Sequence, residues 1–259
     1  MKTREQLLSC IEDDMELMGE QRIVYLKEEG DQVVDYDYLP SEEYCEAVTL
    51  KELQTDLRMR EFEEQISDDV STEGRRLAVI FPGIGYTCEK PLLYYSEQLA
   101  KQCGYEIIHV NYSDFPKNIK GDSKKMKEAF DLALAQTKEI LKDVEWSAYR
   151  EILFLSKSIG TVVSSCYAKD QRLKVKNILF TPLKETFQFA EMPCVIFHGT
   201  ADLWAETEEI QKLAGIHQIP IDVAEGANHS LETGNVSKDV DILRNIIQKL
   251  QLFVKQTQF

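Results

Sequence analysis

A serine, an aspartate and a histidine, each placed shortly after an apolar run, have the residue types needed for nucleophilic catalysis. Ser158 follows the run LFLSK, Asp202 follows VIFHGTA, and His229 follows IDVAEGAN. In such a set the histidine takes the serine proton, the serine attacks a carbonyl carbon, and the carboxylate orients the imidazole. The three residues therefore predict acyl transfer, with Ser158 as nucleophile, His229 as base and Asp202 as acid.

The segment around Ser158, S-K-S-I-G, is close to the G-x-S-x-G pattern of a sharp strand-to-helix turn. Such a turn needs small residues two positions before and two positions after the nucleophile. Gly160 meets this requirement, and Ser156 is small enough to replace the first glycine. Lys157 is expected to be solvated. The alternative is that Ser158 only caps a helix.

The acid and the histidine lie in two loops with their own alternatives. Asp202 ends the segment H-G-T-A-D, where it could instead cap the following helix, and His198 is expected to be structural. His229 lies in E-G-A-N-H-S, where Gly226 permits a tight turn that points the imidazole back over the sheet edge. The alternative for His229 is a surface loop histidine.

A glycine loop, F-P-G-I-G-Y-T, precedes these segments and follows a strand. It could supply a backbone N–H to an oxyanion, so the predicted donors are Ile84 and Ile159, with Gly85 as the alternative to Ile84. No Gly-Lys-Ser/Thr follows, which excludes a phosphate-binding loop. Aromatic side chains that could line an acyl pocket, or belong to the core, are Tyr86, Phe187, Phe189 and Trp204.

The elements that must position these residues alternate between short apolar strands and helices. This alternation predicts an α/β fold, with a mostly parallel sheet and helices on both faces. Expected strands are 77–81, 106–111, 151–155, 177–180, 194–198 and 219–224; expected helices are 91–103, 123–142, 158–169, 206–214 and 237–254.

Residues 1–74 have a different pattern from the rest of the chain. A helix over 3–18 begins with a Thr3/Gln6 capping box, and a hairpin of strands 22–26 and 33–39 follows around the turn 29–31. A second capping box, Thr49/Glu52, opens an amphipathic helix that reaches Ile66, before a polar loop over 67–74. We expect the hairpin to form the first strands of the main sheet, with 41–74 as an insertion. The amphipathic helix is either scaffold or a cover over the site.

Together, the glycine loop, elbow, acid loop and histidine loop occur in the order expected of α/β hydrolases. From Leu77 onward the chain resembles that superfamily, in particular its small dienelactone-hydrolase-like or esterase-like members. It departs from the usual pattern at Ser156, in place of glycine, and at Pro82, where many members have histidine. The interval Thr181–Pro193 has only 13 residues, which leaves no room for a large cap after the sixth strand.

The resemblance implies two domains, an acidic segment 1–74 and a catalytic core 75–259. It implies a serine hydrolase that cleaves a carboxylic ester or thioester through an acyl-enzyme. An amide or peptide hydrolase and an acyltransferase use the same triad and stay open as alternatives. A non-catalytic binding protein of this fold is the alternative from another class, although such proteins usually lose a triad member.

Charge and composition restrict the partners. The net charge of −15 lies entirely in residues 1–74, which hold 22 acidic and 7 basic side chains. This sign disfavours nucleic acid, and no apolar run is long enough to span a membrane. Six cysteines without CxxC spacing and the lack of a recognisable signal peptide favour a cytoplasmic protein with free thiols. We expect a small-molecule acyl substrate and no metal or cofactor, and the oligomeric state is not predicted.

Overall fold

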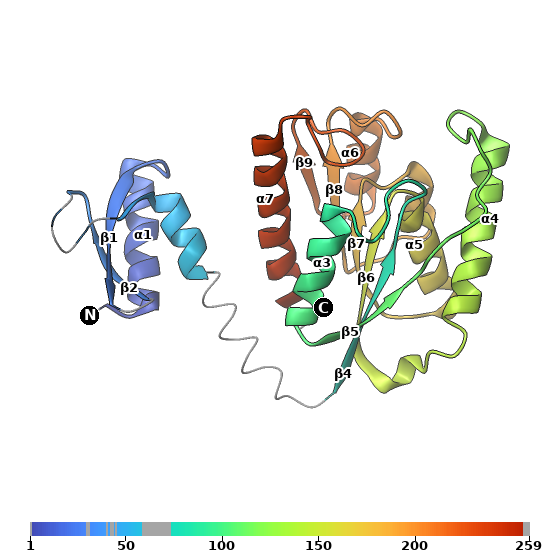
Figure 1. Ribbon diagram of the computed structural model, residues 1–259, viewed down its shortest axis with the longest axis horizontal. Coiled ribbons are helices and arrows are strands. Elements are labelled where there is room, and N and C mark those ends of the chain that lie inside the picture. The colour runs from blue at the N-terminus through green and yellow to red at the C-terminus, as the bar shows by residue number, and fades with distance from the viewer. Residues whose placement is uncertain are drawn as a thin grey trace. The chain divides into compact units, whose positions relative to one another are not determined.

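The chain divides into two compact units, Met1–Ser71 and Thr72–Phe259. The computed structural model describes residues 2–29, 32–39, 41, 44, 46–58 and 74–255 (Figure 1). Each unit has a hydrophobic core of its own.

The smaller unit contains helix α1 (Arg4–Met18) and a three-stranded antiparallel sheet in the order β2-β1-β3. Helix α1 begins after Thr3, which forms the predicted capping box with Gln6. Residues 50–58 are helical, and the predicted reciprocal hydrogen bonds between Thr49 and Glu52 cap their start. The strands are β1 (Ile23–Glu29), β2 (Gln32–Asp37) and β3 (Glu46–Thr49).

The expectation that the hairpin belongs to the main sheet was wrong. Strand β1 pairs with β2 on one side and with β3 on the other, and its apolar side chains enter a local core. Val24 packs there with Ile11 of α1 and with Leu53 of the following helix. A strand joins a sheet through its edges, and both edges of β1 are already paired within this separate three-stranded sheet. Residues 30–31 of the predicted turn, residues 59–66 of the predicted amphipathic helix, and residues 67–73 of the predicted loop lie outside the described residues.

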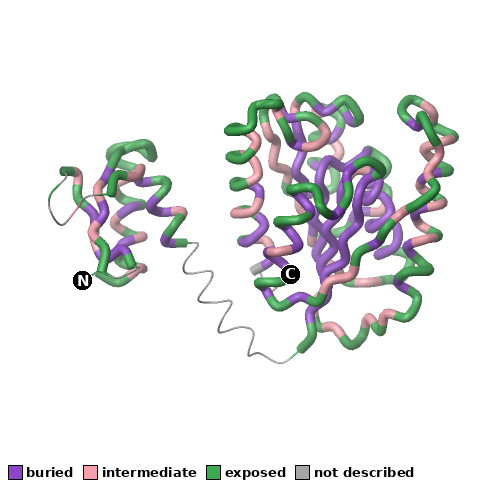
Figure 2. The backbone as a smooth tube through the Cα atoms, viewed as in Figure 1, coloured by how far each residue is buried: buried purple, intermediate pink, exposed green. Residues whose placement is uncertain are grey.

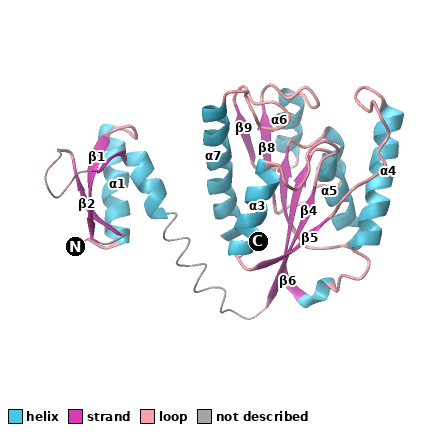
Figure 3. Cartoon of the chain, in the orientation of Figure 1, coloured by secondary structure: helices cyan, strands magenta, loops and turns pink. Residues whose placement is uncertain are grey.

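The larger unit is the predicted parallel sheet between helices. Its six strands follow the order β5-β4-β6-β7-β8-β9, and every neighbouring pair is parallel. Helices α3 and α7 lie on one face, and α4 and α5 lie on the other (Figures 1 and 3). The elements are β4 (Arg75–Phe81), α3 (Pro91–Gln102), β5 (Tyr105–His109), α4 (Ser123–Ile140), β6 (Tyr149–Lys157), α5 (Ile159–Gln171), β7 (Lys176–Phe180), β8 (Cys194–Gly199), α6 (Thr207–Ile216), β9 (Ile221–Ala224) and α7 (Val236–Lys255).

The central strands are buried on both faces, which explains their unbroken apolar sequences. Every residue of β7 is buried, and so are six consecutive residues at the end of β4 and of β6 (Figure 2). Since all six strands run the same way, the loops that follow them meet at one edge of the sheet. This edge receives the glycine loop after β4, Ser158 after β6, Asp202 after β8 and His229 after β9.

The connection from β7 to β8 contains only a short 3-10 helix, Lys184–Gln188. The predicted absence of a large cap at this place is therefore seen in the fold. Among the helices of the described residues, none combines the length and apolar character needed to cross a membrane.

Candidate active site

Ser158 occupies a sharp turn between the end of β6 and the start of α5. Its backbone has φ 56° and ψ −125°, a conformation that side chains other than glycine rarely adopt. Its N–H donates to the carbonyl of Phe180 at 3.0 Å, and its carbonyl accepts from the amide of Thr161 at 2.9 Å. The turn is thus held by both neighbouring elements, β7 and α5, with the serine side chain half-buried at the sheet edge.

The small residues on each side of Ser158 are required by close packing. A Cβ on Gly160 would lie 2.6 Å from the carbonyl oxygen of Pro82, and closer still to that of Phe81. Ser156 is fully buried, and its hydroxyl donates to the carbonyl of Ile178 at 2.9 Å. A serine therefore fits the position where the pattern usually has glycine, because its single hydroxyl finds an acceptor on β7.

The structure brings Ser158, Asp202 and His229 together in one hydrogen-bonded chain. His229 Nε2 lies 2.8 Å from Ser158 Oγ, and His229 Nδ1 lies 2.7 Å from Asp202 Oδ2. A carboxylate can only accept, so Nδ1 is the donor of this pair, and Nε2 is left to accept the proton of the serine hydroxyl. The arrangement has the direction needed to move a proton from Ser158 toward His229.

The loops that present the acid and the histidine are tied to each other. The amide of Ala201 donates to the carbonyl of Ala227 at 2.9 Å, and Gly226 N–H donates to Thr200 Oγ1 at 2.7 Å. Gly199 lies under this crossing, where a Cβ would be 2.7 Å from the carbonyl carbon of Ala227. These contacts fix the separation of the two loops, and with it the distance from Asp202 to His229.

The electrostatics of the site favour an ionised Asp202 and a neutral His229. Burial alone would raise the pKa of Asp202, but the hydrogen bond from His229 and the amide of Trp204, 2.8 Å from Oδ1, bring that pKa below its usual value. Burial lowers the pKa of His229, and the hydrogen bond to Asp202 only partly offsets this effect. At neutral pH the imidazole is therefore free to accept a proton.

His198, expected to be structural, lies at the end of β8 with its side chain fully buried. Its Nε2 is 3.2 Å from Thr207 Oγ1, and its Nδ1 is 3.8 Å from Asp202 Oδ2. Burial lowers the pKa of His198, so it stays neutral beside the carboxylate. His198 therefore lies behind Asp202, while His229 occupies the side that faces the serine.

Lys157, expected to be solvated, is instead fully buried, and that expectation was wrong. As the last residue of β6 it lies in the interior strand, and its side chain runs beneath the histidine loop. Its Nζ donates to the carbonyl of His229 at 2.6 Å and also to Thr181 Oγ1. Sequence reasoning did not single out Thr181. The available signal for burial was its place in the same strand, two residues after the apolar run 152–155.

The two predicted N–H donors belong to different segments: Ile159 directly follows Ser158, and Ile84 lies in the glycine loop after β4. Ile159 is the first residue of α5, and the first N–H groups of a helix have no acceptor within it. Ile84 lies in the turn closed by the bond from Gly83 N–H to the carbonyl of Tyr86, 3.0 Å long. A Cβ on Gly83 would be 3.2 Å from Ser158 Cβ, so this loop runs directly against Ser158.

Two hollows flank the triad. A groove of about 1010 Å³ includes Asp202 and Trp204, and the Trp204 ring lies 5.7 Å from the His229 ring. A smaller apolar pocket of about 150 Å³ includes Tyr86 and Leu231. Phe187 lines neither of these hollows: it is buried beneath α6, so of its two expected places, acyl pocket and core, the structure shows the core. Phe189 stacks on Phe130, with ring centroids 6.5 Å apart.

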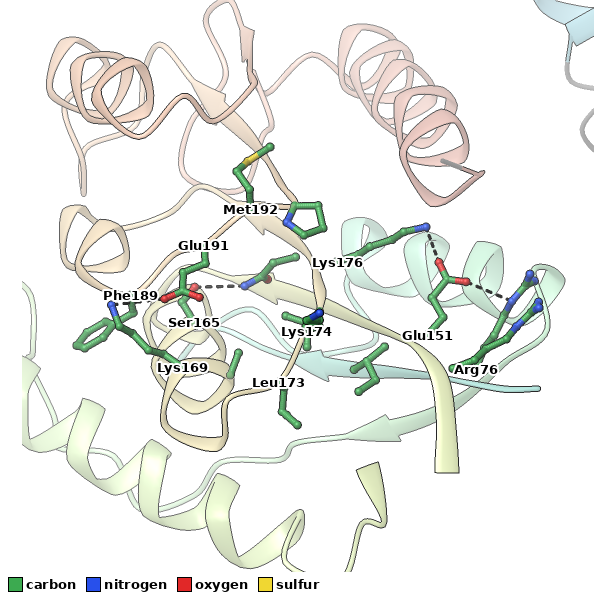
Figure 4. A pocket seen from close by; sticks show the side chains of 16 residues that line it. Arg76, Glu151, Ser165, Lys169, Leu173, Lys174, Lys176, Phe189, Glu191 and Met192 are labelled. Atoms are coloured by element: carbon green, nitrogen blue, oxygen red, sulfur yellow. Dashed lines mark hydrogen bonds and ion pairs between the residues drawn. The ribbon is translucent and has the colours of Figure 1, made fainter. Parts of the chain in front are cut away.

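Another pocket, of about 650 Å³, lies at the opposite, amino edge of the sheet (Figure 4). Charged side chains at the starts of three strands pair across it, with Glu151 between Arg76, at 3.3 Å, and Lys176. The triad residues come from the carboxyl edge, so this pocket is not part of the candidate active site. Among the described residues, no group of three or more histidine, cysteine or acidic side chains is arranged to hold a metal ion.

Comparison with known proteins gives a family match over the larger unit. Residues 75–255 match the family described as "Alpha/beta hydrolase domain". No curated protein matches the chain significantly. The chain is similar in structure to an alpha-beta serine hydrolase homologue from Coxiella burnetii, with 18% identity, TM-score 0.51, and coverage of 69% of this chain and 86% of that one.

Two further solved structures show the same fold at low identity. An esterase from Pyrococcus furiosus has 12% identity and TM-score 0.51, and the match covers 71% of this chain and 83% of that one. Est1E from Butyrivibrio proteoclasticus, solved with ferulic acid bound, has 14% identity and TM-score 0.50, with coverage of 71% and 90%. At these identities the likeness concerns the fold.

Proposed function

The chain belongs to the α/β-hydrolase family, and we propose that it is a serine hydrolase that cleaves a carboxylic ester or thioester. The observation that supports this most directly is the chain of hydrogen bonds from Ser158 through His229 to Asp202. It lies on a strained turn at the edge of the sheet where ligands bind in parallel α/β folds. A serine that only capped α5 would need neither the imidazole nor the strain, and its side chain makes no capping hydrogen bond.

In the proposed reaction, His229 Nε2 takes the proton of Ser158 as Oγ attacks the carbonyl carbon. The tetrahedral intermediate collapses when the C–O or C–S bond breaks and His229 returns the proton to the leaving oxygen or sulfur. Water then attacks the acyl-enzyme with His229 again as base, and the carboxylic acid is released from Ser158. Asp202 holds the Nδ1–H tautomer and stabilises the imidazolium that forms in each half.

The negative charge on the carbonyl oxygen is proposed to be held by the N–H groups of Ile159 and Ile84. Ile159 adds the favourable field of the α5 N-terminus to its hydrogen bond. Ile84 follows Gly83, and a residue larger than glycine at 83 would press on the nucleophile. A glycine before the donor thus lets this backbone approach the reacting carbon.

The substrate is proposed to lie across the triad, between the groove beside Trp204 and the apolar pocket beside Tyr86. The pocket beside Tyr86 has about 150 Å³, which suits a short apolar acyl group. Trp204 is partly exposed over the imidazole and offers a flat apolar surface to the other part of the substrate. No metal or organic cofactor takes part in this scheme.

The test is turnover on a matched panel of esters, thioesters and peptides with the same short acyl group. We expect the wild type to hydrolyse the esters and thioesters, and Ser158→Ala to lose turnover while its circular dichroism is unchanged. Folded wild-type protein that cleaves only the peptides would contradict the ester assignment. Turnover that persists in Ser158→Ala would contradict the serine mechanism.

A further inference from the structure

We propose that Lys157 is a positioning residue for His229: its buried amine fastens the histidine loop to the nucleophile elbow and keeps the imidazole in line between Ser158 and Asp202. The inference rests on the proposed function of this site. It assigns a task to a residue that the serine mechanism itself does not use.

Lys157 Nζ has three contacts. One N–H donates to the carbonyl of His229 at 2.6 Å, and a second donates to Thr181 Oγ1. The third has the ring of Tyr86, whose centroid is 5.2 Å from Nζ. The amine thus makes two hydrogen bonds and one contact at cation–π distance. The partners come from three different loops around the active site.

Thr181 makes the attachment two-sided. Its hydroxyl accepts from Lys157 and donates to the same His229 carbonyl at 3.1 Å. Thr181 has φ 41°, a strained value for a β-branched residue, and its amide is held by the carbonyl of Phe197 at 2.7 Å. The hydroxyl is thus aimed by a fixed backbone, and the His229 carbonyl receives two donors, one from Lys157 at the end of β6 and one from Thr181 directly after β7.

The position of Lys157 links its backbone directly to the nucleophile. Lys157 directly precedes Ser158 in the chain. The side chain that binds the His229 carbonyl is therefore attached to the residue next to Ser158. A rotation of the histidine loop would have to break both hydrogen bonds to the His229 carbonyl. The hydrogen bond between His229 Nε2 and Ser158 Oγ is 2.8 Å long. A small movement of the histidine loop would lengthen it and slow proton transfer.

The charged groups that face Lys157 also connect it to the basicity of His229. Burial lowers the pKa of Lys157 to about 7, against the opposing effects of Asp202 and Glu232. The positive charge of Lys157 in turn contributes to the lowered pKa of His229, as does that of Lys120, and Lys157 also contributes to the lowered pKa of His198. When Lys157 is protonated, it therefore opposes an imidazolium at His229.

The test compares Lys157→Met, which keeps length and apolar volume, with Thr181→Val, which removes only a hydroxyl. We measure kcat and KM on para-nitrophenyl butyrate, and we follow the His229 ring by NMR of isotope-labelled histidine in the absence of substrate. A His229→Asn spectrum assigns the signal. Thr181→Ser retains the hydroxyl, and Lys174→Met is the control for loss of an exposed lysine elsewhere.

For Lys157→Met we expect kcat to fall about tenfold with KM changed less than about twofold, because an aligning hydrogen bond is lost while the substrate pocket is kept. The midpoint of the His229 titration should move to higher pH, since a neighbouring positive charge is gone. Thr181→Val should lower kcat without that upward movement, and Thr181→Ser should restore kcat. Lys174→Met should match the wild type.

The inference is overturned if folded Lys157→Met retains kcat within about twofold of the wild type, or if its His229 titration stays in place or moves to lower pH. If Lys157→Met does not fold, the two Thr181 variants decide. A wild-type kcat in Thr181→Val overturns the inference. A lower kcat in Thr181→Val that is restored in Thr181→Ser supports it. A wild type that hydrolyses no ester or thioester contradicts the proposed function instead. The substrate-free titrations then still decide the linkage between Lys157 and His229.

Discussion

Ser158 has a backbone conformation that costs free energy, of the order of 1–3 kcal/mol for a residue other than glycine. Such strain persists only where neighbouring groups determine the backbone, and here the amide and carbonyl of Ser158 are both hydrogen-bonded. The result is an Oγ fixed 2.8 Å from His229 Nε2 before any substrate binds. If Ser158 is the nucleophile, as proposed, this strain preorganises its hydroxyl for attack.

Replacing Asp202 by asparagine should abolish most turnover. The amide can donate to Nδ1 and so favours the tautomer with the proton on Nε2, which cannot accept from Ser158. We expect kcat to fall about 10³- to 10⁴-fold with little change in thermal stability. Steady-state kinetics checks this, with Asp131→Asn, an exposed carboxylate on α4, as the control. Near-normal turnover in Asp202→Asn would point to a different carboxylate.

The pH dependence of kcat/KM should follow the lowered pKa of His229. The base must be neutral to act, so activity is lost as pH falls through the pKa of His229 in the free enzyme. Because burial holds this pKa below 6.5, the ordinary value for histidine, the acidic limb should have its midpoint below pH 6.5. A pH–rate profile measures it. A midpoint clearly above 6.5 would contradict a buried, neutral base.

At the residue scale, the sequence pointed to three side chains that lie together in the structure, because each needed only the right residue type at the end of a strand. The state of Lys157 could not. All neighbours of Lys157 on β6 are buried, so no alternation marks which side chains face solvent. Its surroundings are created by the histidine loop, which lies 72 residues further along the chain. For Phe187 the sequence left acyl pocket and core as alternatives, and only the packing under α6 decides that it is core.

At the element scale, two glycines allow loops from different strands to cross at close range. Gly160 lies where α5 passes the end of β4, and Gly199 lies where the acid loop passes the histidine loop. In both places the obstacle to a larger residue is backbone, which cannot swing aside as a flexible side chain can. These crossings set the spacing of the elbow, the acid and the base.

Gly160→Ala should therefore destabilise the larger unit and lower activity. Its Cβ would overlap the carbonyl oxygens of Phe81 and Pro82, and forced overpacking of this kind costs about 2 to 3 kcal/mol. Chemical denaturation followed by tryptophan fluorescence measures the loss. Gly215→Ala is the matched control, because that Cβ meets nothing within 4 Å at the end of α6. Equal stability of both variants would contradict this account of the elbow.

The parallel sheet could be predicted because its strands are buried on both faces and have unbroken apolar sequences. Strand β3 was missed because its four residues, Glu46–Thr49, are exposed or half-buried and show no apolar run. The hairpin was predicted as a hairpin but was assigned to the wrong sheet. Its alternating pattern identifies one apolar face, and the pattern cannot say which core covers that face.

At the scale of the whole molecule, the chain has two separate sets of buried side chains. The smaller unit packs Leu7, Ile11, Val24 and Leu53 together, and the larger unit has its own clusters around the sheet. Small domains bury a lower fraction of their surface and gain less from folding. The acidic character lies in the first 74 residues, and their role as a cover over the site stays a prediction.

Unfolding should therefore occur in two steps. Both tryptophans, Trp146 and Trp204, belong to the larger unit, whereas circular dichroism reports on both units. We expect a first transition visible only by circular dichroism and a later one visible by both probes. Leu53→Ala removes a buried side chain from the core of the smaller unit. It should lower the free energy of unfolding of the first transition by about 2–5 kcal/mol and leave the fluorescence transition unchanged. One coincident transition that this substitution shifts for both probes would contradict two independent cores.

The most direct test of the central claim is covalent labelling by a fluorophosphonate. The oxygen of an activated serine bonds to its phosphorus as fluoride leaves, and the phosphonyl group stays on the serine. Mass spectrometry of the digested protein should find a single adduct on Ser158 in the wild type, and none in folded Ser158→Ala. Labelling of His229→Ala should be strongly slowed, since the serine proton has no acceptor. A folded wild type that takes no label, or takes it on another residue, would contradict Ser158 as the nucleophile.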